Sequence, residues 1–385
     1  MYASLLCVLA LSFAVDSSKI LIYVGNLPMG SHVRVSNFLG NSLVQHGHEV
    51  WFLIPDTFYD RRIKEDKGKV FSYITMPVNF TAEEVDRANN DFLDKSMNGE
   101  TTSLYNSLKT LLSNEQKRGE AKRFKHVLEA MVVACDILLN DDALISKIRK
   151  EKFDFLIGDS LMPCHHLLSK RILTSYATLD VPPVLPALIS KIRVPSNPAY
   201  VPEGFSHLTD EMNFFQRLLN FLMAQAVPLA MDIFLHNPLL AIETKDNDIK
   251  DVLKSSQENL FSSVDIWFGV NCHPAIEFPR PVTIDMLCTR GMLSTPSNQI
   301  LDIQLLSFVQ SARHGVVLIS MGSLVNMSSG DLLETLAAAF SRLPYSVVWK
   351  YNSKFPPMRL GNNTKLMNWI PQNDLLGNKQ IRSLF

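Results

Sequence analysis

The sequence predicts an α/β protein with two Rossmann-like domains that face a cleft, each built on a parallel sheet covered by helices on both faces. Two observations favour this fold. Continuous apolar strands such as Ile20–Val24 and Val50–Ile54 are separated by segments with helical periodicity, as in buried parallel sheets. The order strand, turn, helix, strand also occurs a second time, starting at Gly315.

The first domain is predicted to span residues 19–270. After the strand Ile20–Val24 comes a turn-rich loop, then a helix whose apolar residues recur at helical spacing until Gly47, then the strand Val50–Ile54. Further along we expect a helix-rich stretch over 80–150, the strand Phe153–Ile157, a helix from Pro163, an irregular proline-rich stretch over 180–204, helices from Asp210 to Gln257 and a strand at Val264–Val270.

The second domain is predicted over residues 313–385, after a proline-rich interdomain linker at 271–312. Roughly 75 residues cannot complete a doubly wound sheet, so we expect this domain to be incomplete. Its predicted elements are the strand Gly315–Ile319, the turn Ser320–Ser323, the helix Asp331–Ser341 capped by Ser329, the strand Ser346–Lys350 and a third strand at Lys365–Met367.

Composition excludes several classes of protein. The 385 residues are 46% hydrophobic and 19% charged, which indicates a globular protein with a real core. With 37 basic and 38 acidic side chains, a broad nucleic-acid-binding surface is not expected. The five cysteines form no C-x-x-C pair, so neither a zinc knuckle nor a thioredoxin-type site is supported, and no disulfide can be deduced from their spacing.

Residues 1–16 have the features of a secretory signal peptide. The apolar run Tyr2–Val15 is too short to span a membrane, small and polar residues follow it, and a separate strand begins at Lys19. No Lys or Arg precedes the run, and a buried first strand is the alternative interpretation. The sequons at Asn79, Asn326 and Asn362 are compatible with secretion.

A second apolar segment, Leu218–Leu235, is interrupted by polar residues and by Pro228. We therefore expect a helix that packs in the protein or rests on a membrane surface, in preference to a transmembrane span.

His32 and Asp159 are candidates for acid–base chemistry. His32 lies in the first turn of the helix after the first strand, and Asp159 follows a later strand by two residues, so both should lie at the carboxyl edge of one sheet. A helix N-terminus favours neutral imidazole, and a carboxylate can orient the ring and stabilise the imidazolium that proton transfer creates. The alternative is that His32 is a polar cap and Asp159 a turn residue.

Two further segments can bind a nucleotide. Ser320, Gly322 and Ser323 can present backbone N–H groups and hydroxyls to a diphosphate, or form an ordinary turn between strand and helix. Trp369 and Gln372 flank a rigid proline turn and can stack on a base and bond its edge, or simply pack. P-loop and dinucleotide fingerprints are absent from the sequence, and the adjacent His165-His166 pair does not suit a metal.

The run Trp369–Gly377 (WIPQNDLLG) closely resembles the W-x-P-Q-N-D-L-L-G-H start of the UDP-glycosyltransferase signature, in the form found in the animal UDP-glucuronosyltransferases. The likeness covers essentially the whole chain in the family's order. Other segments similar to the family are Gly315–Ser323, Val347–Lys350, Gly30–His32, Gly47–Val50 and Asp159 with Pro163-Cys164.

This resemblance implies a GT-B fold and transfer of a glycosyl group, with glucuronosyl favoured over glucosyl, from a UDP-sugar to a hydroxyl of a small lipophilic acceptor with inversion. His32 would be the general base and Asp159 its orienting partner. Trp369 would stack on uracil, Gln372 would bond the nucleotide, and the diphosphate would lie near Ser320, Gly322 and Ser323. No metal and no cofactor besides the UDP-sugar co-substrate are implied.

The resemblance also implies a glycoprotein of the endoplasmic reticulum lumen, membrane-associated in its full-length form, and leaves homo- and hetero-oligomers open. The sequence departs from the family at Asn378, where His is usual, and it ends before the family's H-x-G-x-x-S/G-x-x-E segment and membrane anchor. We therefore expect little or no transfer by this chain alone. The alternative is a non-catalytic lumenal fragment that binds hydrophobic ligands or regulates a full-length homologue.

Overall fold

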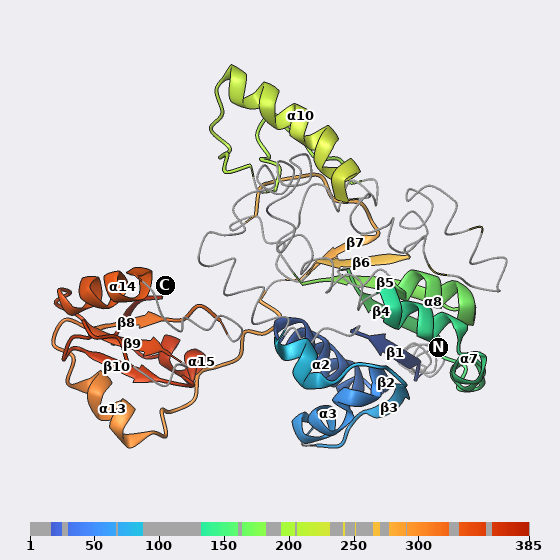
Figure 1. Ribbon diagram of the computed structural model, residues 1–385, viewed down its shortest axis with the longest axis horizontal. Coiled ribbons are helices and arrows are strands. Elements are labelled where there is room, and N and C mark those ends of the chain that lie inside the picture. The colour runs from blue at the N-terminus through green and yellow to red at the C-terminus, as the bar shows by residue number, and fades with distance from the viewer. Residues whose placement is uncertain are drawn as a thin grey trace, which may run out of the picture. The chain divides into compact units, whose positions relative to one another are not determined.

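The computed structural model describes residues 17–24, 30–66, 68–87, 132–160, 164–181, 194–204, 206–231, 242, 251, 265–269, 277–289, 291–322, 331–351 and 356–384. They divide into two compact units (Figure 1). The first holds the described residues up to Asp86 and from 132 to Met292; the second holds those from Leu293 onward, together with Arg87.

The first unit is built on a parallel sheet of seven described strands in the order β3-β2-β1-β4-β5-β6-β7. The chain starts in the middle of the sheet, moves outward to β3, and then crosses back to place β4 on the other side of β1. The two strands β1 and β4 therefore flank a topological switch point, where open α/β sheets bind their ligands. The strands are β1 (Lys19–Tyr23), β2 (Glu49–Pro55), β3 (Ser72–Met76), β4 (Phe155–Asp159), β5 (Ser175–Asp180), β6 (Ile266–Gly269) and β7 (Met286–Cys288).

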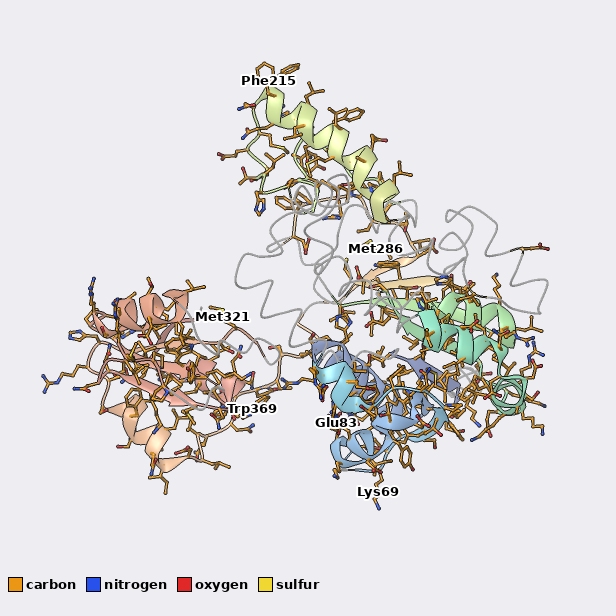
Figure 2. All side chains as sticks on the ribbon, viewed as in Figure 1. Lys69, Glu83, Phe215, Met286, Met321 and Trp369 are labelled. Atoms are coloured by element: carbon orange, nitrogen blue, oxygen red, sulfur yellow. A yellow bond between two sulfur atoms is a disulfide. The ribbon has the colours of Figure 1, made fainter. Side chains whose placement is uncertain are left out.

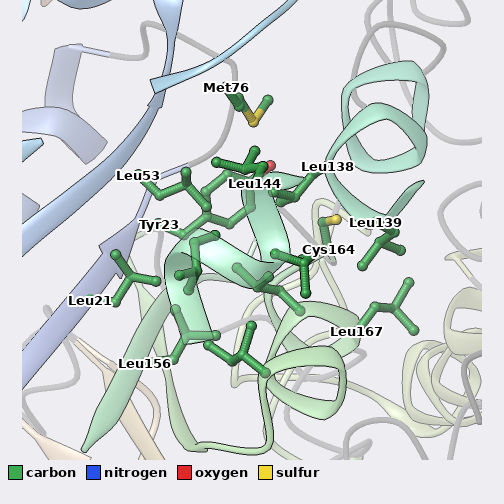
Figure 3. Packing of buried hydrophobic residues seen from close by; sticks show 14 of the residues in the cluster. Leu21, Tyr23, Leu53, Met76, Leu138, Leu139, Leu144, Leu156, Cys164 and Leu167 are labelled. Carbon is green, nitrogen blue, oxygen red and sulfur yellow. The ribbon is translucent and has the colours of Figure 1, made fainter. Parts of the chain in front are cut away.

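Helices cover both faces of this sheet, because alternate strand residues point to opposite sides. Leu21 and Tyr23 of β1 join a core lined by α7, α8 and the helical residues 132–140 (Figure 3). Ile20 and Ile22 join the opposite core, which includes Val35 of α2. The described helices of this unit include α2 (Gly30–Gln45), η1 (Asp56–Phe58), α3 (Tyr59–Glu65), α7 (Asp142–Lys150), α8 (Cys164–Ile172) and α10 (Phe214–Met231).

A disulfide joins Cys135 and Cys164, whose Cα atoms are 5.6 Å apart, inside the first of these cores. It ties the helical residues 132–140 to α8, a connection that cysteine spacing alone does not identify. Cys288 of β7 is disulfide-bonded as well.

The second unit has a four-stranded parallel sheet in the order β10-β9-β8-β11 among its described residues. Helices α13 and α15 pack on one face with Val316 and Leu318, and α14 packs on the other with Val317 and Ile319. The elements are α13 (Ile303–Gln310), β8 (Val316–Ile319), α14 (Asp331–Ser341), β9 (Ser346–Lys350), β10 (Thr364–Met367), α15 (Gln372–Leu376) and β11 (Ile381–Leu384).

The predicted fold class, two parallel α/β sheets of Rossmann type, is confirmed. The range 271–312 predicted as a linker contains two elements, because β7 pairs with β6 of the first sheet and α13 packs in the core of the second unit. The sequence did not indicate β7, because this strand is only three residues long and the proline-rich segments on either side of it have no strand pattern. The predicted signal peptide, the cap Ser329 and the sequon at Asn326 lie outside the described residues.

In the part of the chain that is described, none of the helices has the length and apolar character needed to cross a bilayer. Helix α10 lies where the sequence predicts an interrupted apolar helix, and it carries many exposed large side chains (Figure 2, where Phe215 is labelled). These are Phe214, Phe215, Leu218, Leu219, Phe221, Leu222 and Leu229.

Candidate active site

His32 lies in the first turn of α2, which begins at Gly30, shortly after β1 ends at Tyr23. The helix continues as far as Gln45 and buries its inner face, including Val35, against the sheet. This placement carries the imidazole to the carboxyl edge of the sheet. His32 is only 6% exposed there.

Asp159 is the last residue of β4 and is 2% exposed. The strand extends two residues beyond its predicted end, because its ladder with β5 continues to the pair Asp159–Leu179. β4 lies beside β1, so the carboxylate reaches the histidine that follows β1. His32 Nδ1 and Asp159 Oδ2 are 2.5 Å apart. The structure thus brings together the two residues predicted as an acid–base pair.

The chemistry of this pair follows from its geometry. An ionised carboxylate only accepts hydrogen bonds, so Nδ1 is the protonated nitrogen by inference and Nε2 carries the lone pair. Nε2 can therefore take a proton from a hydroxyl. The buried Asp159 carboxylate then stabilises the imidazolium that forms, while the hydrogen bond keeps the ring from rotating.

Two neighbouring residues, Ser160 and Asp180, were missed by sequence reasoning. The Ser160 hydroxyl donates to Asp180 Oδ1 at 2.7 Å, and both side chains are buried. Burial, the largest cause, raises the pKa of Asp180 to about 7. The feature that could have indicated Asp180 is an Asp at the end of β5, the strand beside β4, which ends with Asp159.

The end of β4 is packed closely by His165 of α8. A Cβ on Gly158 would lie 2.1 Å from the ring of His165, so only glycine fits there. The His165 ring forms a 2.9 Å hydrogen bond with the Thr178 hydroxyl of β5. His165 thus packs against the end of β4 that carries Asp159, and the ring of His166 contacts that of His165 edge-on. No cluster of three or more metal-ligating side chains occurs among the described residues.

In the second unit, the predicted diphosphate turn follows β8. Gly322 has a φ of +84°, a left-handed conformation that glycine adopts without strain, and its N–H donates to the Ser320 hydroxyl at 3.4 Å. Ser323 lies outside the described residues. Ser320 and Gly322 are therefore brought together at the carboxyl edge of this sheet.

Lys350, at the end of β9, connects this turn to Trp369. Its ammonium donates to the Gly322 carbonyl at 2.6 Å and lies 5.5 Å from the centre of the Trp369 ring. Trp369 is 62% exposed, so its ring is available for stacking (Figure 2). Burial lowers the pKa of Lys350. Sequence reasoning placed Lys350 in a strand and assigned it no role at the site.

Gln372 is exposed at the start of α15, three positions after Trp369. The residues after it hold the chain that enters the unit: Asn373 Nδ2 donates to the Thr295 carbonyl at 3.1 Å, and Asp374 Oδ1 accepts from Asn298 N at 2.8 Å. A Cβ on Gly377 would lie 2.0 Å from Ser297 Oγ. The run Trp369–Gly377 therefore carries the exposed Trp369 and Gln372 and also contacts residues 295–298 through Asn373, Asp374 and Gly377.

Two parallel α/β units of this kind have the architecture of the GT-B fold, which the chain shares with solved glycosyltransferases. The glycotransferase of kitacinnamycin shares the fold with a TM-score of 0.55 and 12% identity, covering 96% of this chain and 75% of that one. Arabidopsis thaliana UGT89C1, solved in complex with UDP-L-rhamnose, has a TM-score of 0.53, again at 12% identity, covering 96% and 74%.

The family is shown by the sequence. The family model for UDP-glucoronosyl and UDP-glucosyl transferase matches residues 20–385, and the chain belongs to that family. The 2-hydroxyacylsphingosine 1-beta-galactosyltransferase of Rattus norvegicus is 30% identical over 95% of this chain and 62% of its own length. UDP-glucuronosyltransferase 3A1 of Bos taurus is 28% identical over 95% and 66%. The chain thus spans about two thirds of these relatives.

Proposed function

We propose that the protein transfers a glycosyl group from a UDP-sugar to a hydroxyl of a small lipophilic acceptor. The observation that carries this proposal is the buried 2.5 Å hydrogen bond between His32 and Asp159, which lies at the switch point of the first sheet. The chain belongs to a family of UDP-sugar transferases, which supports the choice of donor. Residues 19–270 would bind the acceptor, and residues 313–385 would begin the donor-binding domain.

In the proposed reaction His32 Nε2 removes the proton of the acceptor hydroxyl as its oxygen attacks the anomeric carbon. The bond from that carbon to the diphosphate oxygen breaks, and UDP leaves with the electron pair. A single displacement inverts the anomeric centre, which turns an α-linked donor into a β-glycoside. Asp159 stabilises the imidazolium until the proton passes to solvent.

Trp369 and Gln372 would hold the uridine, the first by stacking and the second by hydrogen bonding. Ser320, Gly322 and Ser323 would lie near the diphosphate. Backbone N–H groups and hydroxyls can stabilise the charge on the leaving diphosphate, so the proposal includes neither a metal nor a cofactor. Its support is the contact network through Lys350 that links the Ser320–Gly322 turn to Trp369.

For the donor sugar we propose glucuronate, because the run Trp369–Gly377 has the form found in the animal glucuronosyltransferases. Galactose is the second candidate, since a relative at similar identity is named a galactosyltransferase. Competition among UDP-glucuronate, UDP-galactose and UDP-glucose on the complete gene product tests the choice. A preference for UDP-galactose or UDP-glucose would overturn glucuronate and leave the base assignment intact.

The alternative of a non-catalytic lumenal fragment is tested by the same assay. Binding of lipophilic compounds without transfer from any of the three UDP-sugars would favour it over the enzyme. His32→Ala gives a second test between the two functions, because ligand binding by a non-catalytic fragment should not require a base.

We also propose that the protein enters the endoplasmic reticulum and associates with its membrane. The disulfide Cys135–Cys164 suits an oxidising compartment, Asn79 and Asn362 are exposed sequon positions, and α10 offers an apolar surface. Protease protection in microsomes, glycosidase digestion and carbonate extraction test the three parts. A cytosolic, unprocessed and unglycosylated chain would contradict this localisation.

A further inference from the structure

Asp180 is a fully buried carboxyl group close to the His32–Asp159 pair. It is the last residue of β5, and its exposed fraction is 0%. β5 runs parallel to β4, and Asp159 is paired with Leu179, the residue just before Asp180. The two carboxyl groups therefore lie at the same edge of the sheet, on neighbouring strands.

Ser160 connects the two carboxyl groups. It directly follows Asp159, and its backbone N–H donates to the Leu179 carbonyl at 2.9 Å. Its hydroxyl donates to Asp180 Oδ1 at 2.7 Å. With an exposed fraction of 6%, Ser160 is shielded from competing water. These two bonds fasten the residue behind Asp159 to the end of β5.

The second oxygen of Asp180, Oδ2, is buried and has no hydrogen-bond partner among the residues that the structure describes. A buried carboxylate with an unpaired oxygen is costly, so burial raises the pKa of Asp180 to about 7. Among the groups that face it, the charges of Asp159 and Glu277 also raise this pKa, whereas the Ser160 bond and His32 lower it. Arg280 lies 3.5 Å from the Glu277 carboxylate. Asp180 therefore changes charge near neutral pH, beside the pair.

We propose that Asp180 is a positioning residue of the His32–Asp159 pair: it holds Asp159 in place through Ser160 and adds its negative charge when His32 takes up a proton. The inference rests on the proposed function for its catalytic part. Above neutral pH the ionised Asp180 stabilises the imidazolium and speeds proton removal. Below neutral pH Asp180 is protonated and contributes only its hydrogen bond.

If Asp180 has a purely structural role, Asp180→Asn should behave like the wild type, because the amide keeps an oxygen that accepts from Ser160 and the substitution removes only the charge. Asp66→Asn is the matched control. Asp66 is also buried, but it accepts from the backbone N–H groups of Val70 and Phe71 just before β3, at the amino edge of the sheet.

The first test is an NMR titration of the histidine rings in the 385-residue chain, with the His32 signal assigned by His32→Gln. We expect the His32 signal to report the ionisation of Asp180 as an inflection near pH 7, in addition to any change from protonation of the ring itself. This inflection should disappear in Asp180→Asn and persist in Asp66→Asn. Ser160→Ala should move the inflection to higher pH, because the Ser160 bond lowers the pKa of Asp180. If Asp180→Asn does not fold, the Ser160→Ala shift carries the test.

The second test is the pH profile of kcat in the complete gene product. Asp180→Asn should lower kcat about tenfold at pH 8 and less than about twofold at pH 6, with an unchanged KM for the UDP-sugar. A His32 titration curve or a pH profile of kcat in Asp180→Asn that matches the wild type would overturn the inference. Failure of the wild type to transfer any sugar would refute the proposed function instead, and the NMR titration would then decide alone whether Asp180 acts on His32.

Discussion

His32 and Asp159 are 127 positions apart in the sequence, yet their side chains form one buried pair. Their proximity follows from strand order, because β1 and β4 are neighbours and both residues lie at the carboxyl ends of these strands. Each residue should contribute differently to transfer, since in the proposed reaction only His32 takes up the proton.

At the same scale, Asp159→Asn should reduce kcat less than loss of the base does. The imidazole remains, but the amide neither stabilises the imidazolium nor fixes the same tautomer. We expect roughly a 30-fold loss for Asp159→Asn against roughly 1000-fold for His32→Ala, within the range of general base catalysis. Steady-state kinetics on both variants measure the ratio, and an equal or larger loss for Asp159→Asn would contradict the assigned roles.

Asp180 should also make stability depend on pH. Its pKa is raised to about 7 in the folded state, above that of an exposed carboxyl in the unfolded chain, so the folded state retains the proton more strongly. This contribution is present at low pH and is lost as pH rises through 7. Thermal unfolding should therefore show Asp180→Asn gaining stability over the wild type from pH 5 to pH 8. A constant difference would mean that Asp180 does not titrate there.

At the scale of elements, the sequence predicts strands well where both faces are apolar. The ranges predicted for β2, β8 and β9 agree with the structure to within a residue at each end. β5 escaped prediction because Thr178 and Asp180 interrupt its apolar pattern, although both are fully buried and hydrogen-bonded. His32 and Asp159 could be predicted because each lies just after an apolar strand that the sequence pattern indicates. Asp180 could not, because β5 itself is not predicted and its pairing with β4 is needed to bring Asp180 close to Asp159.

The disulfide Cys135–Cys164 should stabilise the first unit. Its cysteines are 29 residues apart, and closing such a loop raises the free energy of the unfolded chain by about 3.6 kcal/mol. We expect Cys135→Ser combined with Cys164→Ser to lower the free energy of unfolding by about that amount in denaturant titrations. Because Cys288 is disulfide-bonded as well, both proteins are also measured in a reductant, where the wild type should become as stable as the variant. A difference between the two proteins that is unchanged by the reductant would contradict the assignment.

Gly377 should tolerate no side chain while Ser297 lies against it. An added Cβ would lie 2.2 Å from the Ser297 Cβ, so Gly377→Ala should destabilise the second unit by about 1–3 kcal/mol. Ser297→Gly alone should have a small effect, and in combination it should restore most of the loss. A double-mutant cycle measures this coupling; additive effects would show that the contact with Ser297 is not the cause.

At the scale of the whole molecule, the two units begin with the same strand order. β2-β1-β4 in the first unit corresponds to β9-β8-β11 in the second, so each sheet has its switch point beside its first strand. His32 and Asp159 lie at the first of these points, and the Ser320–Gly322 turn follows β8 at the second. The candidate residues thus lie where ligands bind in open parallel sheets, one set in each unit.

The central claim is that His32 is the base of a UDP-sugar transfer. The most direct test compares the complete gene product with its His32→Ala variant, measuring sugar transfer and UDP affinity in parallel. We predict that the variant loses transfer by about 1000-fold while its Kd for UDP changes less than about twofold, because uridine would bind in the other unit. Nearly full kcat in His32→Ala would contradict the claim.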